Sequence, residues 1–214
     1  IYYSGNDKEV PITCLDIKLH HRADNTKSRS SYLGLLKLGI EEDPHGARAR
    51  YYYARELMYV KQYEESVKEF DAYLALPSAW WNEERAAALT HSANCLRALG
   101  KKHEALKKAQ LATIEFPRSR EPWMELARAA YDLADWSTCF YAVSKALQIK
   151  EATPGFVSDP RSWGHEIYDL AALSSHYLGL EKLALVYGQT ALDLNPSDDR
   201  LQKNMQFYQE AAQA

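Results

Sequence analysis

The sequence predicts an all-α fold: a right-handed solenoid of about four helix-turn-helix repeats, with a leading helix, a capping helix and a short N-terminal β segment. One observation is a repeated pattern. Residues 98–117 and 177–196 of the 214-residue chain share Leu, Gly, Ala, Leu, Gln, Ala and Pro at positions 79 residues apart. The other is a shorter period, because Ala127 follows Ala93 by 34 residues and Ala146 follows Ala112 by the same number. A unit of this length with two helices cannot bury its own apolar side, so successive units must stack.

Four predicted repeats account for most of the chain, near residues 47–80, 86–119, 120–150 and 165–198. The spacing of 79 equals two periods of 34 plus 11 extra residues, and these belong to the segment 151–162. That segment is rich in Pro, Gly and Ser and cannot continue a helix. Five more residues are inserted near residues 77–81, between the first and second repeats.

Small residues recur at one position in the first helix of each repeat. Two antiparallel helices approach closely only where small side chains face each other, and larger neighbours then fill the grooves. Gly100 and Gly179 follow two of these helices and permit the left-handed backbone that commonly ends a helix. The recurring small residues are Ala54, Ala93, Ala127 and Ala172.

The flanking segments predict how the solenoid begins and ends. Residues 30–44 carry apolar side chains on one helical face and are expected to form a leading helix. Residues 198–214 carry another apolar stripe and are expected to form the capping helix that a solenoid end needs for solubility. Val10, Ile12 and Cys14 alternate with polar residues, the period of a β-strand. We therefore expect a strand and loop segment over residues 1–29 and a solenoid over residues 30–214.

Composition argues against several classes of function. The net charge is −3, so no global field attracts nucleic acid or an anionic membrane. No apolar run approaches the roughly 18 residues of a membrane-spanning helix. Cys14, Cys95 and Cys139 are widely spaced, which argues against a disulfide framework or a structural zinc site and favours a cytoplasmic location. The chain begins at Ile1 rather than Met, and we interpret it as a fragment or a processed product.

From about residue 30 to the C-terminus the sequence resembles the tetratricopeptide-repeat family. It departs from that pattern at Ser66, Lys102 and Ala134, where the family usually has Ala, an aromatic residue and Gly. The resemblance implies a non-catalytic interaction or scaffold module with a protein or peptide partner, and it leaves a homo-oligomer open. The residues that match the motif in kind and place are Gly100, Ala105, Ala112, Pro117, Trp123, Leu126, Ala127 and Ala146.

A narrower resemblance runs nearly end to end. The stretches LHHRAD, NTKSRSSYL and REPWMELARAAYDLADW look like the C-terminal region of bacterial and phage family 2 glycosyltransferases, in which a tetratricopeptide tail follows a GT-A catalytic domain. This resemblance implies an alternative function, the orientation of an acceptor or partner for an upstream catalytic domain, with residues 1–29 as the end of that domain. Nucleotide-sugar and a divalent metal would bind only to such an upstream domain. This chain has no Asp-x-Asp motif and no cofactor site of its own is expected, so whether it is part of an enzyme stays open.

Two histidines at the end of the predicted strand have two interpretations. In some GT-A enzymes a His after the last strand completes the metal shell, and the resemblance places His20 or His21 in that position. The alternative is an exposed pair of histidines without a ligand. The other histidines considered are scattered without metal-ligand spacing and are His91, His103, His165 and His176.

Candidate binding residues follow from the geometry of a helical solenoid, which presents its first helices on a concave face. Arg55, Asn94 and Arg128 each follow the small Ala of their helix and could form a ladder that holds a carboxylate or phosphate on an extended anionic segment. The alternative is a solvated ladder neutralised by neighbouring carboxylates. The full set of concave candidates is Tyr51, Arg55, Asn94, Met124, Arg128 and Asp169.

A second candidate surface is aromatic. Trp80 and Trp81 lie in the insertion between the first two repeats and could stack sugars or proline-rich peptides. The alternative is that they fill a groove between helices.

Overall fold

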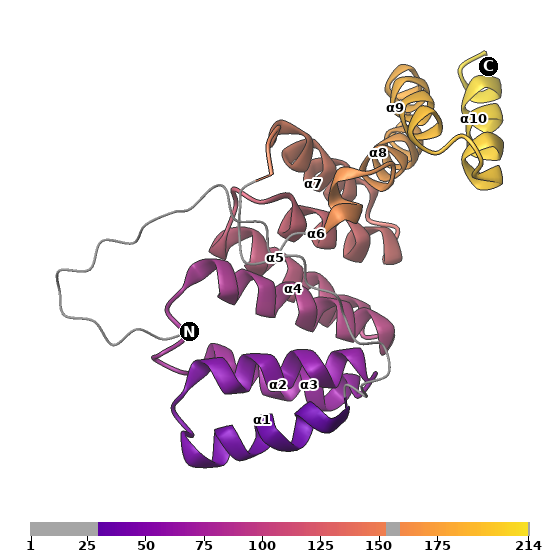
Figure 1. Ribbon diagram of the computed structural model, residues 1–214. Helices are drawn as coiled ribbons and strands as arrows, with labels where there is room; N and C mark the ends of the chain where they lie inside the picture. Colours follow the sequence, from indigo (N-terminus) through magenta and orange to yellow (C-terminus); the bar gives the residue numbers. More distant parts are fainter. Residues whose placement is uncertain (1–29, 153–158, 214) are drawn as a thin grey trace, which may run out of the picture.

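The computed structural model describes residues 30–152 and 159–213, and every regular element within these ranges is helical. The helices stack in chain order from α1 at one end to α10 at the other (Figure 1). The predicted N-terminal β segment, Cys14, His20 and His21 lie outside the described residues. None of the helices in the described part of the chain is both long and apolar enough to cross a membrane.

Four antiparallel helix pairs form the body of the solenoid, preceded by α1 and followed by α10. A short 3₁₀ helix, η1 (Pro160–Trp163), precedes the fourth pair and lies in the segment predicted to interrupt the repeats. The α-helices are α1 (Ser30–Glu42), α2 (Ala47–Tyr59), α3 (Tyr63–Leu74), α4 (Asn82–Ala98), α5 (Lys102–Glu115), α6 (Arg120–Asp132), α7 (Trp136–Gln148), α8 (Glu166–Tyr177), α9 (Glu181–Leu194) and α10 (Asp199–Ala211).

The helix pairs lie close to the ranges expected for the repeats. The clearest difference is α4, which begins at Asn82, four residues before the predicted start of the second repeat. Glu83 and Glu84 occupy its first turn, where carboxylates interact favourably with the helix dipole. This electrostatic preference favours a helix that begins within the insertion.

The recurring small residues lie in the core. Ala54, Ala93, Ala127 and Ala172 of the first helices are all at most 1% exposed. The facing positions in the second helices are equally buried and are Ser66, Ala105, Cys139 and Ala184. The prediction that small side chains allow close helix packing is confirmed.

Ser66 shows how a polar residue occupies a position where the family usually has Ala. Its Oγ donates a hydrogen bond of 2.8 Å to the carbonyl oxygen of Ala54 in the facing helix. A buried hydroxyl is costly without a partner, and this bond removes the penalty.

The turn between the two helices of each pair adopts a left-handed backbone at the same position. Gly100 and Gly179 have φ of 73° and 72°, as expected from the sequence. Lys61 and Ala134 occupy the equivalent positions with φ of 63° and 54°, although a side chain there carries a steric penalty. Helix packing therefore imposes the turn conformation whichever residue is present.

Helix α10 covers the C-terminal end of the stack by packing on α9. The contact depends on Gly188, because a Cβ at this position would lie 3.0 Å from the ring of Tyr208 and 3.3 Å from the sulfur of Met205. Tyr208 is fully buried, while the outer side of α10 is polar apart from the exposed Phe207. This distribution is that of a solenoid cap.

Candidate functional site

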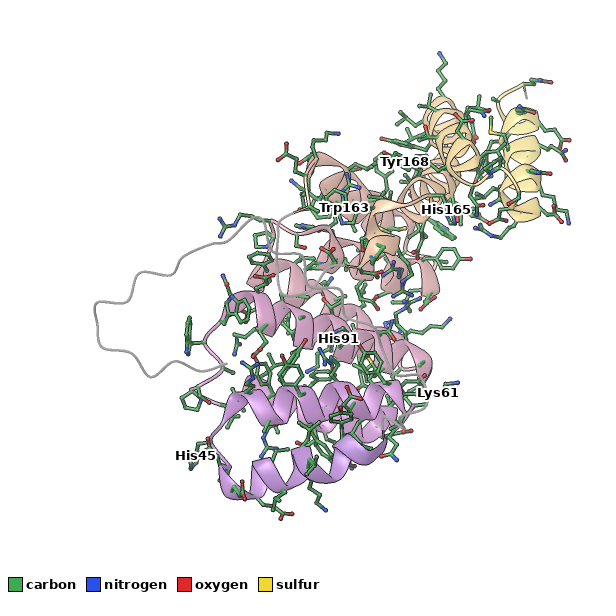
Figure 2. All side chains as sticks on the ribbon, viewed as in Figure 1. His45, Lys61, His91, Trp163, His165 and Tyr168 are labelled. Atoms are coloured by element: carbon green, nitrogen blue, oxygen red, sulfur yellow. The ribbon has the colours of Figure 1, made fainter. Side chains whose placement is uncertain are left out.

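A cavity of about 530 Å³ opens between the first helices α2, α4 and α6, beside residues 159–161. Its walls carry charged and aromatic side chains from three consecutive repeats. Figure 2 shows His91, one of the lining residues, between α2 and α4, and Lys61 at the end of α2.

Four of the six predicted concave residues line this cavity: Tyr51, Arg55, Asn94 and Arg128. The other two lie elsewhere. Met124 is fully buried in the core, on the same side of α6 as Ala127 three residues later. Asp169 forms an ion pair with Arg200 of α10, with 2.8 Å between Oδ2 and Nη1, and this pair links the last repeat to the cap.

Arg128 is almost saturated with carboxylate partners. Its Nε and Nη2 donate to the two carboxylate oxygens of Glu166 at 2.6 and 2.7 Å, a bidentate pair between neighbouring repeats. Its Nη1 lies 3.5 Å from Glu125 and 3.8 Å from Asp159. These carboxylates raise the pKa of Arg128 against the opposing effect of its own burial. Burial likewise opposes the ionisation of Glu166, but Arg128 outweighs it and holds the pKa of Glu166 below its usual range.

Arg55 occupies the same position of the first repeat and has a different environment. Among the described residues it pairs with the carboxylate of Glu56, at 3.9 Å, and its side chain is 29% exposed, against 10% for Arg128. Its guanidinium lies 4.6 Å from the ring centre of Tyr52 and 5.8 Å from that of Tyr59, in the range of cation–π contacts. The buried Nε of Arg55 makes no hydrogen bond to the described residues.

The difference between the two arginines follows from the repeat register. Glu166 lies six residues before Ala172, and the equivalent position in α4, six residues before Ala93, is Ala87. No carboxylate therefore stands opposite Arg55 at the position that neutralises Arg128. Glu121 is the equivalent residue of α6 and lines the cavity, where its carboxylate accepts from the backbone N–H of Asp159 at 3.2 Å.

Two titratable groups with shifted pKa values line the cavity. Burial, aided by the positive charge of Arg55, lowers the pKa of His91 to about 4, so the imidazole is neutral at pH 7. Glu125 is 1% exposed and lies 3.3 Å from Arg97, and burial raises its pKa although Arg97 and Arg128 oppose this effect. Arg97 also pairs with Asp132 at 2.6 Å and so links α4 to α6.

Several lining residues were not expected from the sequence. Glu121 and His91 could have been found from the repeat register, because both stand at fixed distances from the small Ala of their helices. Asp159 and Arg161 could not, since they belong to the insertion before the fourth repeat and reach the cavity only through the fold.

The remaining candidates lie away from the cavity or suggest no metal. Trp80 and Trp81 are exposed in the connection between α3 and α4, and neither lines the cavity. Within residues 30–152 and 159–213, no group of three or more His, Cys, Asp or Glu side chains is arranged to hold a metal ion.

Comparison with solved structures relates this arrangement to a known fold. A crystal structure of MamA matches with a TM-score of 0.64 at 16% identity, over 78% of this chain and 89% of that chain. MamA from Desulfovibrio magneticus RS-1 gives 0.63 at 17% identity, over 81% and 89%. YrrB, described as a TPR protein with an unusual peptide-binding site, gives 0.60 at 18% identity, over 87% and 84%. The chain has the tetratricopeptide-repeat fold.

Comparisons of the sequence do not relate this chain to a family or to a curated protein. Neither a scan of family models nor a search of curated proteins returns a match. The structural similarities reported above give no support to the glycosyltransferase alternative.

Proposed function

We propose that this tetratricopeptide-repeat solenoid is a non-catalytic interaction module whose concave cavity binds an extended, acidic segment of a partner protein. The observation that carries the proposal is the contrast between Arg128, which Glu166 neutralises, and Arg55, which has no equivalent carboxylate opposite it. YrrB, which has the same fold, is described as having an unusual peptide-binding site.

The wall formed by α2 and α4 supplies hydrogen-bond donors for a carboxylate. Arg55 contributes its guanidinium and Asn94 its amide, and both line the cavity. Thr90 lies beside them, and its buried Oγ1 has no hydrogen-bond partner among the described residues. An Asp or Glu side chain, or a C-terminal carboxylate, would accept from these groups in charge-assisted hydrogen bonds.

The opposite wall favours a peptide over a small anion. Glu121 and Asp159 supply carboxylates to the side formed by α6 and η1, where Arg128 and Arg161 also line the cavity, so this wall carries both signs of charge. An extended chain can place a carboxylate near Arg55 and direct backbone N–H groups or a basic side chain toward these acids. The cavity spans three repeats, which suits an extended ligand.

The test is calorimetric titration with a capped nine-residue peptide rich in Asp and Glu, compared with the same peptide carrying Asn and Gln. Replacing Arg55 with Met should weaken binding of the acidic peptide by about 10- to 100-fold, because charged hydrogen bonds contribute about 1.5–3 kcal/mol. Lys107→Met, an exposed charge on the second helix α5, is the matched control and should bind normally. Equal affinity for the two peptides, or unchanged binding by Arg55→Met, would show that the ligand is not held in this way.

A cytoplasmic location forms part of the same proposal. It is supported by Cys95 and Cys139, which are free and buried thiols in the structure.

A further inference from the structure

A row of aromatic side chains lies along the edge of the solenoid near the turns of the third and fourth repeats. Tyr131 packs edge-to-face with Trp136 at a ring-centre distance of 5.9 Å, and Trp136 stacks on Tyr177 at 4.1 Å with an interplanar angle of 5°. Tyr131 and Tyr177 remain 45% and 56% exposed. Exposed aromatic clusters are typical of binding surfaces, because large rigid rings contribute contact area at low entropic cost.

These rings line a groove of about 410 Å³ that is separate from the concave cavity. The groove is completed by Lys102 of α5, Leu173 of α8, and Arg200 and Asn204 of α10. It shares no lining residue with the cavity between α2, α4 and α6. Five helices therefore converge on it, which holds the rings in fixed positions.

The charged groups at this groove already have partners. Asp132 pairs with Arg97 at 2.6 Å, and Arg200 pairs with Asp169 at 2.8 Å. The ammonium group of Lys102 donates to the backbone carbonyl of Asp132 at 2.6 Å. Each charged side chain of the groove therefore has a polar partner within the chain, and no charge without a partner selects an ionic ligand there.

The aromatic groups offer hydrogen-bond donors. Trp136, Tyr131 and Tyr177 all line the groove, and the indole N–H and the two hydroxyls can each donate to a carbonyl oxygen. A matching ligand presents carbonyl acceptors and apolar rings and carries few N–H donors of its own. A proline-rich chain meets this description, because Pro lacks the backbone N–H and its polyproline II conformation exposes its carbonyls.

We propose that this aromatic groove binds a proline-rich segment of a partner protein in the polyproline II conformation. Rings in the groove pack against proline rings, and the indole N–H of Trp136 donates to a backbone carbonyl of the ligand. The ligand enters as a preformed extended helix, so little conformational entropy is lost on binding.

The test uses the indole N–H signals of the ¹⁵N-labelled protein, which contains five tryptophans. The probe is a capped peptide of eight prolines, and a capped Gly-Ser peptide of the same length is the negative control. The signal of Trp136, assigned through Trp136→Phe, should shift saturably with the proline peptide and stay unchanged with the control peptide. The signals of Trp80 and Trp81 should not shift.

Variants separate the groove from general surface effects. Tyr177→Ala should bind the proline peptide about tenfold more weakly, which corresponds to about 1.4 kcal/mol. Tyr177→Phe keeps the ring and should lose only the contribution of the hydroxyl. Tyr141→Ala is the matched control, because Tyr141 is 52% exposed on α7 and packs edge-to-face against Trp123, outside the groove. Melting temperatures close to that of the unsubstituted chain show that a variant is folded.

Three results would overturn the proposal. The first is a Trp136 signal that stays unchanged at millimolar proline peptide. The second is equal binding by Tyr177→Ala and Tyr177→Phe, neither weaker than Tyr141→Ala. The third is a Trp136 signal that moves with protein concentration alone, since the occupant would then be a second copy of this chain.

Discussion

Arg55 and Arg128 occupy equivalent positions, and their replacement should affect the free energy of unfolding very differently. We consider Arg55→Met and Arg128→Met, which keep most of the aliphatic stem and remove the guanidinium. Arg128→Met removes the two hydrogen bonds to Glu166 and leaves Glu125, which is 1% exposed, with Arg97 as its remaining cationic partner. Arg55→Met removes a 3.9 Å ion pair and the contacts with Tyr52 and Tyr59.

The magnitudes follow from these contacts. A charged hydrogen bond contributes about 1.5–3 kcal/mol, and a broken buried ion pair costs about 3–5 kcal/mol. Water can reach the half-buried carboxylate of Glu166 after the substitution, so we expect Arg128→Met to lose about 2–4 kcal/mol. An exposed cation–π contact contributes about 0.5–1 kcal/mol, which sets the expected loss for Arg55→Met.

The assay is urea denaturation followed by circular dichroism, with thermal melting as a second measurement. For a chain of this size each kcal/mol shifts the melting temperature by about 2–4 °C, so Arg128→Met should melt about 4–16 °C lower than the unsubstituted chain. Arg55→Met should stay within a few degrees of it. Equal shifts for the two variants would refute the assignment of Arg128 as a structural residue and of Arg55 as a binding residue.

Three further predictions concern the backbone, the cap and pH. Ala134→Gly should stabilise the chain by about 1 kcal/mol, because Ala134 has a left-handed backbone that glycine adopts without strain. Gly100→Ala should destabilise the chain by a similar amount, so the urea midpoints of the two variants should move in opposite directions. Gly188→Ala should lower the free energy of unfolding by about 1–3 kcal/mol, because its Cβ would clash with Tyr208. Amide hydrogen exchange should accelerate first in α10, and uniform acceleration along the chain would contradict a role of Gly188 confined to the cap. The pKa of His91 is near 6.5 in the unfolded chain and about 4 in the folded chain, so between these pH values protons bind preferentially to the unfolded state. The free energy of unfolding should therefore decrease as the pH falls from 6.5 to 4. The loss is at most about 3–4 kcal/mol. A His91→Gln variant with the same pH dependence of stability as the unsubstituted chain would contradict this prediction.

The helix pairs could be predicted because their packing leaves a local and periodic record in the sequence. Ala54 and its equivalents repeat wherever two helices must approach closely, and the turn glycines mark where the first helices end. The partner of Arg128 could not be predicted in this way. Glu166 lies 38 residues further along the chain, beyond an insertion that hides its register, and the sequence pointed to nearer carboxylates instead.

The candidate site was predicted in part for a similar reason. Solenoid geometry places one position of each first helix on the concave face, and this located Arg55, Asn94 and Arg128 in one cavity. The expectation that Met124 faces the concave surface was wrong. Met124 lies three residues before the small core residue Ala127, on the packed side of the helix, where an apolar side chain stays buried. Tyr51 occupies the equivalent position in α2 and still contributes to the cavity wall.

The junctions between neighbouring repeats carry different pairs at the same two positions: Arg55 with Ala87, Asn94 with Glu121, and Arg128 with Glu166. Because the pair differs from one junction to the next, the repeats are not interchangeable. Excision of the whole second unit, α4 and α5, would bring Arg55 into register with Glu121 and recreate the pairing of Arg128 with Glu166. In such a shortened chain Arg55 would have a carboxylate partner between repeats, so the number of repeats determines whether this arginine is left for the proposed ligand.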